Sequence, residues 1–231
     1  MAAAPRRSKA RTPRRVRVLR GEALRAHARE IQRRLAATYP DAHCELTHRN
    51  AFELAVATVL SAQCTDARVN LVTPELFRRW PTPEALAEAP LEAIETVIRS
   101  TGFYRNKARN IQGLAQALVA DHGGAVPEAM DALVVLPGIG RKTANVVLGN
   151  AFNRNEGIVV DTHVARLSAR FGLTRETDPV KIERALIPLF ERATWTQLSH
   201  LMIWHGRRTC DARSPRCASC VLADICPSAL P

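Results

Sequence analysis

Residues 136–147 read LPGIGRKTANVV and join two helical patterns across a very short turn. Pro137, Gly138 and Gly140 lie in this turn, and glycine permits a positive φ and the close approach of another backbone. The helix that follows begins with free N–H groups, whose partial positive charge suits a phosphate. Lys142 stands just inside that helix. The stretch therefore predicts a turn that binds a nucleic-acid backbone, next to a lysine that acts on the bound strand.

Apolar residues recur at helical spacing along most of the chain from residue 21 onward. The run at 50–61 is apolar on nearly every side, which is typical of a central, buried helix. We expect Pro74 to begin a new turn, and Pro127 to begin the helix that leads into residues 136–147. The sequence contains no convincing period-2 strand and no internal repeat. These patterns predict an all-α protein with ten or eleven helices.

The net charge of the 231-residue chain is +11, which favours polyanionic partners such as nucleic acids. Residues 1–20 hold eight basic residues and no acidic one, so only +3 remains for the rest of the chain. Such a segment is typical of a disordered basic arm that contacts phosphates, of an inert tail or of an organellar transit peptide. No apolar secretory region follows, and no run approaches the ~18 apolar residues of a membrane span, so we expect an intracellular protein.

Lys142 is one of only four lysines in a chain that otherwise prefers arginine. Lysine can lose its proton and become a nucleophilic amine, whereas arginine effectively cannot. A nucleotide-binding P-loop would need a glycine directly before the lysine and a strand leading into it. Arg141 occupies that position and no strand precedes it, so we exclude a P-loop. We expect Arg141 to join Gly138 and Gly140 in contacting the nucleic acid.

Four of the six cysteines lie within seventeen residues: Cys210, Cys217, Cys220 and Cys226. Thiols this close together in an intracellular chain indicate a metal ion or an iron–sulfur cluster more than disulfides. A structural zinc site usually has two tight cysteine pairs and this spacing has one, so zinc and an iron–sulfur cubane both remain open. The loop between the first two cysteines carries Arg213 and Arg216, which either contact phosphates or form a solvated basic surface.

Residues 136–147, the segment VDTH at 160–163 and the spacing of the four cysteines together resemble the endonuclease III family. These are DNA glycosylases with AP lyase activity, of the helix–hairpin–helix superfamily. The resemblance covers residue 22 to the C-terminus and implies a two-domain, all-α fold with DNA across the interdomain cleft. One domain would be a six-helix barrel at residues 44–154. The other would combine residues 21–43 with 155–231 and carry a [4Fe–4S] cluster.

The resemblance also assigns roles to individual residues. Lys142 matches the catalytic lysine and Asp161 the catalytic aspartate, and the four cysteines match the cluster ligands. Gln63 would fill the gap that a flipped nucleotide leaves in the duplex, and Phe103 would wedge the opposite side. The implied function is excision of oxidised pyrimidines from double-stranded DNA, with strand cleavage at the abasic site by β-elimination through a lysine Schiff base. We expect a monomer that acts on DNA in the bacterial cytoplasm.

Several of these residues also have simpler interpretations. By position alone, Asp161 is a helix cap, Phe103 a core aromatic at a helix start and His163 a structural residue. A related adenine glycosylase shares the cluster, but it generally lacks this lysine and carries an additional C-terminal domain, so Lys142 and the short C-terminus favour the pyrimidine enzyme. A non-catalytic DNA-binding module would grip phosphates in the same way, and the combination of Lys142 with Asp161 argues against it.

Overall fold

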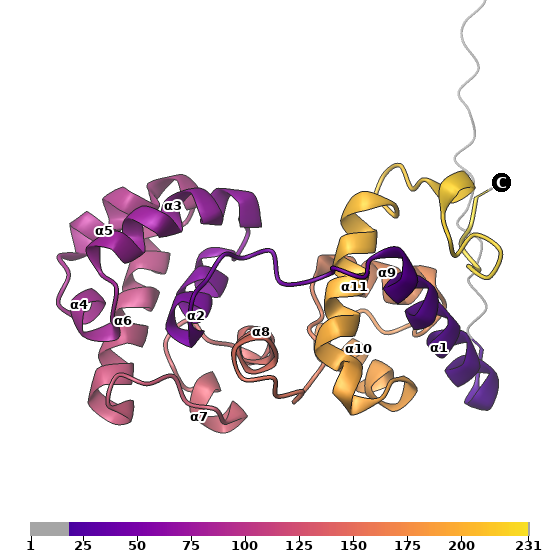
Figure 1. Ribbon diagram of the computed structural model, residues 1–231, viewed down its shortest axis with the longest axis horizontal. Coiled ribbons are helices and arrows are strands. Elements are labelled where there is room, and N and C mark those ends of the chain that lie inside the picture. The colour runs from indigo at the N-terminus through magenta and orange to yellow at the C-terminus, as the bar shows by residue number, and fades with distance from the viewer. Residues whose placement is uncertain (1–18, 231) are drawn as a thin grey trace, which may run out of the picture.

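The computed structural model describes residues 19–230, which form two groups of helices (Figure 1). These residues contain eleven α-helices and no β-strand, which confirms the all-α prediction. The first group comprises α2 (Ala51–Leu60), α3 (Asp66–Arg79), α4 (Pro83–Ala87), α5 (Leu91–Ile98), α6 (Tyr104–His122), α7 (Met130–Val134) and α8 (Arg141–Ala151). The second comprises α1 (Gly21–Thr38), α9 (Thr162–Arg170), α10 (Pro179–Leu186) and α11 (Trp195–Arg208). Short 3₁₀ helices lie at Arg99–Thr101, Ile187–Leu189, Arg192–Thr194 and Cys217–Ser219.

The expected basic arm at residues 1–20 lies outside the described residues, apart from its last two positions. Among the helices of residues 19–230, none has both the length and the apolar character that crossing a bilayer requires.

The core of the first group is built around α2. Asn50 caps this helix, because its side chain accepts a hydrogen bond from the backbone N–H of Glu53 at 2.9 Å. Every residue from Phe52 to Leu60 is buried, which confirms the prediction of a central helix. Since α2 packs against both α6 and α8, it fixes the position of the turn that precedes α8.

The core of the second group joins the two ends of the described chain, so α1 lies beside α9, α10 and α11 in Figure 1. The apolar face of α1, formed by Ala28, Ile31 and Leu35, packs into this core and α1 contacts α11. Ile158 and Val160 enter the same core from a segment without regular secondary structure that leads directly into α9. This segment therefore carries the chain from the first group to the start of α9.

Each group buries its own set of apolar side chains, which supports the predicted division into residues 44–154 and residues 21–43 with 155–231. The boundaries themselves stay a prediction. The groups meet where α8 packs on α11. A Cβ on Gly149 would lie only 2.2 Å from Thr196 Oγ1, so the close approach of these two helices requires glycine.

The prediction that Pro74 begins a new turn is wrong, because α3 runs through it to Arg79. Proline inside a helix costs about 3 kcal/mol through a lost hydrogen bond and a clash with the preceding turn. Leu76 and Phe77 lie just beyond Pro74 and are buried in the core, and burying two such side chains contributes about 3–6 kcal/mol. Packing therefore outweighs the local preference of the proline.

The prediction that Pro127 begins the next helix is also wrong, because α7 begins at Met130. Gly123 and Gly124 end α6, and both have positive φ. The chain then uses residues 125–129 to reverse direction before a one-turn helix forms. The pattern indicated the helix correctly, but the reversal needed three residues more than the proline suggested.

Candidate active site

The turn before α8 contains two glycines with different structural roles. Gly138 has φ +77°, and a Cβ there would lie 3.1 Å from the Cβ of Asn110, so both its conformation and its packing favour glycine. Gly140 is the N-cap residue of α8 and has φ −92°, with no protein atom within 4 Å of a Cβ built on it. The space in front of Gly140 is therefore open to a ligand. Lys142 follows in the first turn of α8 and is exposed.

Asp161 is the N-cap residue of α9, as its position alone predicted. Its Oδ1 accepts a hydrogen bond from the backbone N–H of Val164 at 2.8 Å. The apolar run before it is buried, so the carboxylate is held at the point where the chain leaves the core and enters the helix. Since the cap uses Oδ1, it orients the carboxylate without excluding a role for Oδ2 in chemistry.

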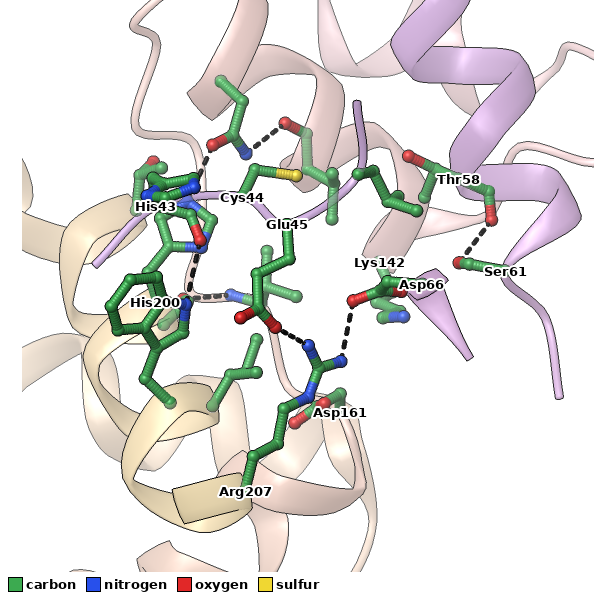
Figure 2. A pocket seen from close by; sticks show the side chains of 18 residues that line it. His43, Cys44, Glu45, Thr58, Ser61, Asp66, Lys142, Asp161, His200 and Arg207 are labelled. Atoms are coloured by element: carbon green, nitrogen blue, oxygen red, sulfur yellow. Dashed lines mark hydrogen bonds and ion pairs between the residues drawn. The ribbon is translucent and has the colours of Figure 1, made fainter. Parts of the chain in front are cut away.

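Lys142 and Asp161 line the same space between the two groups of helices. Both border a cleft of about 1080 Å³ and an adjoining pocket of about 80 Å³. Figure 2 shows them at the pocket, Lys142 contributed by α8 and Asp161 by the start of α9. Gln63 and His163 border the larger cleft. The fold thus brings together the amine, the carboxylate and the glutamine that the sequence singled out.

Phe103 lies outside this cleft, in the turn between α5 and α6. It is 65% exposed, so its interpretation as a core aromatic is wrong. Its φ of +49° is a left-handed conformation, which is costly for a side chain of this size. The buried Lys107 helps to hold the turn, because its Nζ donates a hydrogen bond to the carbonyl oxygen of Thr101 at 2.8 Å. The structure therefore keeps a large apolar side chain exposed at the cost of backbone strain.

Arg141 forms a two-point ion pair with Glu183 of α10. Its Nε and Nη2 donate to the two carboxylate oxygens at 2.8 and 3.0 Å. Glu183 is buried and also accepts a hydrogen bond from Asn145 Nδ2 at 3.1 Å. The guanidinium is therefore engaged by protein, and the DNA contact expected of Arg141 would have to compete with this pair.

The four clustered cysteines surround one cavity of about 140 Å³, which Arg170 and His205 also line. All six cysteines of the chain are free thiols, so the disulfide alternative is wrong. Within residues 19–230, no three metal-ligating side chains of the His, Cys, Asp and Glu types converge closely enough to hold a single ion. Four thiols distributed around a cavity fit the donor set of an iron–sulfur cubane.

The surroundings of these thiols also suit a cluster. Arg170 Nη1 donates a hydrogen bond to Cys210 Sγ at 3.1 Å, which places a positive charge beside a candidate ligand. Burial raises the pKa of the Cys220 and Cys226 thiols, so metal binding must displace their protons. The fold therefore places the four thiols around the cavity, and a bound cluster would hold them as thiolates.

Arg213 and Arg216 project from the loop between the first two cysteines, and both are exposed. Asp211 shapes this loop, because its Oδ1 accepts the backbone N–H groups of Arg213 and Ser214 at 2.8 and 3.1 Å. Those two bonds lower the pKa of Asp211. Among the described residues, no carboxylate lies within 4.0 Å of either guanidinium, so neither is held in an ion pair.

The sequence did not indicate a cation that joins the two groups at the mouth of the pocket. Arg207, near the end of α11, donates through Nη2 to Asp66 Oδ2 at 2.7 Å and through Nη1 to Glu45. Figure 2 shows its guanidinium between the two carboxylates. Thr65 caps α3, so the carboxylate of Asp66, the first residue of that helix, is not used as its cap. No local pattern relates Arg207 to partners 141 and 162 positions away.

His200 and Asn150 form a second polar pair on the pocket wall that the sequence did not reveal. His200 Nε2 lies 2.7 Å from Asn150 Oδ1. Burial lowers the pKa of His200 to about 4, so the ring is neutral at physiological pH.

Two family models match the chain. Residues 56–192 match the HhH-GPD superfamily of base excision DNA repair proteins, and residues 210–226 match the iron–sulfur binding domain of endonuclease III. Endonuclease III of Synechocystis sp. is 52% identical over 202 residues, which cover 87% of this chain and 92% of that protein. Two solved structures, a non-covalent endonuclease III–DNA complex and a trapped endonuclease III–DNA covalent intermediate, each match with a TM-score of 0.85. Each is 48% identical and covers 89% of this chain and 96% of its own.

Proposed function

Because this chain belongs to the endonuclease III family of HhH-GPD base excision DNA repair proteins, we propose that Lys142 is its catalytic nucleophile and that Asp161 assists it. The observation that carries this proposal is the shared cleft. Lys142 enters it from the first turn of α8 and Asp161 from the N-cap of α9, so each helix group contributes one of the two residues.

The protein is a bifunctional DNA glycosylase and AP lyase of base excision repair, and its partner is double-stranded DNA that contains damaged bases. We propose oxidised pyrimidines as the lesions, since the related adenine glycosylase generally lacks a lysine at the position of Lys142. We place this activity in the bacterial cytoplasm, because the relative reported above is bacterial.

The proposed reaction begins when the damaged nucleotide leaves the base stack and enters the cleft. The neutral amine of Lys142 attacks C1′, and the bond from C1′ to the base breaks with its electron pair leaving on the base. Opening of the sugar ring gives a Schiff base between C1′ and Lys142 Nζ. Loss of a proton from C2′ then expels the 3′ phosphate by β-elimination and cuts the strand. Asp161 stabilises the positive charge that develops on the sugar.

Residues around this site bind the DNA on either side of the lesion. Gly140 leaves the N-terminus of α8 open, so its free N–H groups are available to a phosphate next to the lesion. Gln63 borders the cleft and suits the gap left by the flipped nucleotide. Phe103, exposed on a strained turn, suits insertion between base steps. Arg213 and Arg216 extend the basic surface to the second helix group.

The chain carries a [4Fe–4S] cluster, and we propose Cys210, Cys217, Cys220 and Cys226 as its ligands. When bound, the cluster supplies iron–thiolate bonds that tie the C-terminal segment together. This segment contains little regular structure besides Cys217–Ser219, so it depends on such cross-links for a fixed shape. A fixed loop in turn holds Arg213 and Arg216 in place.

A panel of duplexes tests the proposal directly. It contains thymine glycol, 5-hydroxycytosine, dihydrouracil, uracil and an abasic site, each opposite its normal partner. The purified protein should cut the oxidised-pyrimidine and abasic duplexes, Lys142→Ala should cut none, and Asp161→Asn should be slower on all of them. A protein that binds these duplexes without cutting them would be a DNA-binding module, and the proposal would be wrong.

A further inference from the structure

Three carboxylates border the cleft and pocket that Lys142 enters: Glu45, Asp66 and Asp161. A carboxylate paired with a lysine stabilises its protonated form and makes the amine unavailable for attack. Within residues 19–230, however, no carboxylate oxygen lies within 4.0 Å of Lys142 Nζ. The three acids are occupied elsewhere, since Asp161 caps α9 and the other two bind Arg207.

Arg207 is suited to hold both acids at once. Its two terminal nitrogens reach Glu45 and Asp66 separately, and the side chains of all three residues are only 21–33% exposed. Burial opposes the charge on Arg207, but the two carboxylates raise its pKa above the usual value, so the guanidinium stays charged. Because α11 carries Arg207 while the acids belong to the first group, the contact also spans the cleft.

We propose that Arg207 is a positioning residue that withholds Glu45 and Asp66 from Lys142 and so keeps the amine available as a nucleophile. This inference rests on the proposed role of Lys142. Arg208 Nη2 also lies 3.5 Å from Glu45, so that acid keeps one cation without Arg207. Asp66, by contrast, would line the same pocket as the amine with no other lysine or arginine within 4.0 Å among residues 19–230. In the part of the chain that the structure describes, Lys142 is the one other lysine or arginine that borders both the cleft and the pocket with Asp66.

Arg208 can partly replace Arg207 at Glu45, but the other titratable groups at the cleft and pocket do not replace Arg207 at Asp66. Burial lowers the pKa of His200 to about 4 and also lowers the pKa of His163, which disfavours a positive charge on either ring. His43 lies on the pocket wall, but its Nδ1 contacts the carbonyl oxygen of Asp41 at 2.6 Å. The thiols of Cys44 and Cys64 carry no positive charge in either protonation state, and Arg141 is held by Glu183.

The test is the pH dependence of single-turnover strand cleavage at a preformed abasic site, with enzyme in excess. In Arg207→Met, which keeps the length of the side chain without its charge, the acidic limb of the profile should move up by about one pH unit or more. The rate at pH 7 should then fall about tenfold or more, and it should recover as the pH rises. Arg207→Lys keeps a cation and should move the limb less. An equal loss of rate at every pH would overturn the proposal.

A second variant answers the question even if Arg207→Met folds poorly. Glu45→Gln/Asp66→Asn retains hydrogen-bond acceptors for Arg207 but removes both negative charges, so the limb should move to lower pH. An unchanged or raised limb would contradict the inference.

Borohydride trapping on the same abasic duplex separates the two proposals. If the wild-type protein gives no covalent adduct, the proposed role of Lys142 is wrong. If it gives an adduct and neither variant shifts the acidic limb of the pH profile, only the proposed role of Arg207 is wrong.

Discussion

Arg141 binds both carboxylate oxygens of Glu183, at 2.8 and 3.0 Å, so the residue directly before Lys142 is anchored to α10. Glu183 lies in the second helix group and Arg141 at the start of α8 in the first. The pair therefore fixes the N-terminus of α8 relative to α9, which carries Asp161. Together with the close approach of Gly149 and Thr196, it sets how the amine and the carboxylate are placed along the cleft.

Removing this anchor should destabilise the protein. Glu183→Ala leaves the Asn145 amide and part of the Arg141 guanidinium without a partner in a largely buried site. Because Arg141 is 44% exposed and partly solvated, we expect a loss of about 1–3 kcal/mol in the free energy of unfolding. Urea denaturation measures it. Glu183→Gln keeps one acceptor and should lose less, and equal losses for the two variants would argue against this account of the pair.

Alanine substitutions at the two glycines of the turn should affect different properties, stability at Gly138 and DNA binding at Gly140. Gly138→Ala forces a side chain into a left-handed conformation and against Asn110, so it should lose about 1–3 kcal/mol of stability. Gly140→Ala meets no protein atom and should change stability by less than about 0.5 kcal/mol. Its methyl group would instead occupy the space proposed for a phosphate and weaken binding to an abasic-site duplex. Thermal unfolding and fluorescence anisotropy measure the two effects, and normal DNA binding by Gly140→Ala would count against a phosphate at this position.

Loss of one proposed cluster ligand should disorder the C-terminal segment. Cys226→Ser should reduce the iron and sulfide content of the purified protein and make residues 210–226 accessible to protease. The segment should open because iron–thiolate bonds would hold a stretch that has little regular structure of its own. Cys64→Ser is the matched control, since this thiol lies at the cleft, away from the cavity, and its loss should leave the iron content unchanged. A Cys226→Ser protein with full iron content would show that the ligand set is wrong.

Stability should fall on mild acidification in part because of His200. Burial depresses its pKa from 6.5 to about 4, so the unfolded chain binds a proton at a higher pH than the folded one. The neutral ring thus favours the folded state fully above pH 6.5, and this contribution is lost as the pH falls toward 4. Between pH 7.5 and pH 5, the wild type should lose about 2 kcal/mol more than His200→Gln, whose amide retains a donor for Asn150. Urea denaturation at the two pH values measures this. Equal losses in the free energy of unfolding for the wild type and His200→Gln would contradict the account.

The fold was largely predictable because its signals are local. The apolar run of α2 and the periodic face of α1 indicate buried helices, and Asn50 and Asp161 cap helices as their positions suggest. Pro74 shows the limit of such reasoning, since tertiary burial of its neighbours overrides a local preference. Phe103 shows the same limit, because its exposure and its left-handed backbone depend on contacts that the rest of the fold makes with the turn.

The sequence predicts those parts of the site that a single residue in a motif identifies. Lys142, Asp161 and Gln63 could be identified from motifs, and the fold places them along one cleft. Their electrostatic surroundings could not be predicted, because the pairs that create them join distant positions. Arg141 and Glu183 are 42 residues apart, and Arg207 and Glu45 are 162 apart. Only the folded chain shows that these arginines bind carboxylates of the same protein.

The central claim, that Lys142 forms the covalent bond to DNA, is tested most directly by locating that bond. The Schiff base that the protein forms with an abasic-site duplex is reduced with borohydride. The cross-linked protein is then digested, and the peptide that carries the DNA is identified by mass spectrometry. The chain has only four lysines, so the assignment is unambiguous. We predict that the adduct lies on Lys142 and that Lys142→Ala abolishes it. An adduct on Lys107 or Lys181, or one that persists in Lys142→Ala, would contradict the claim.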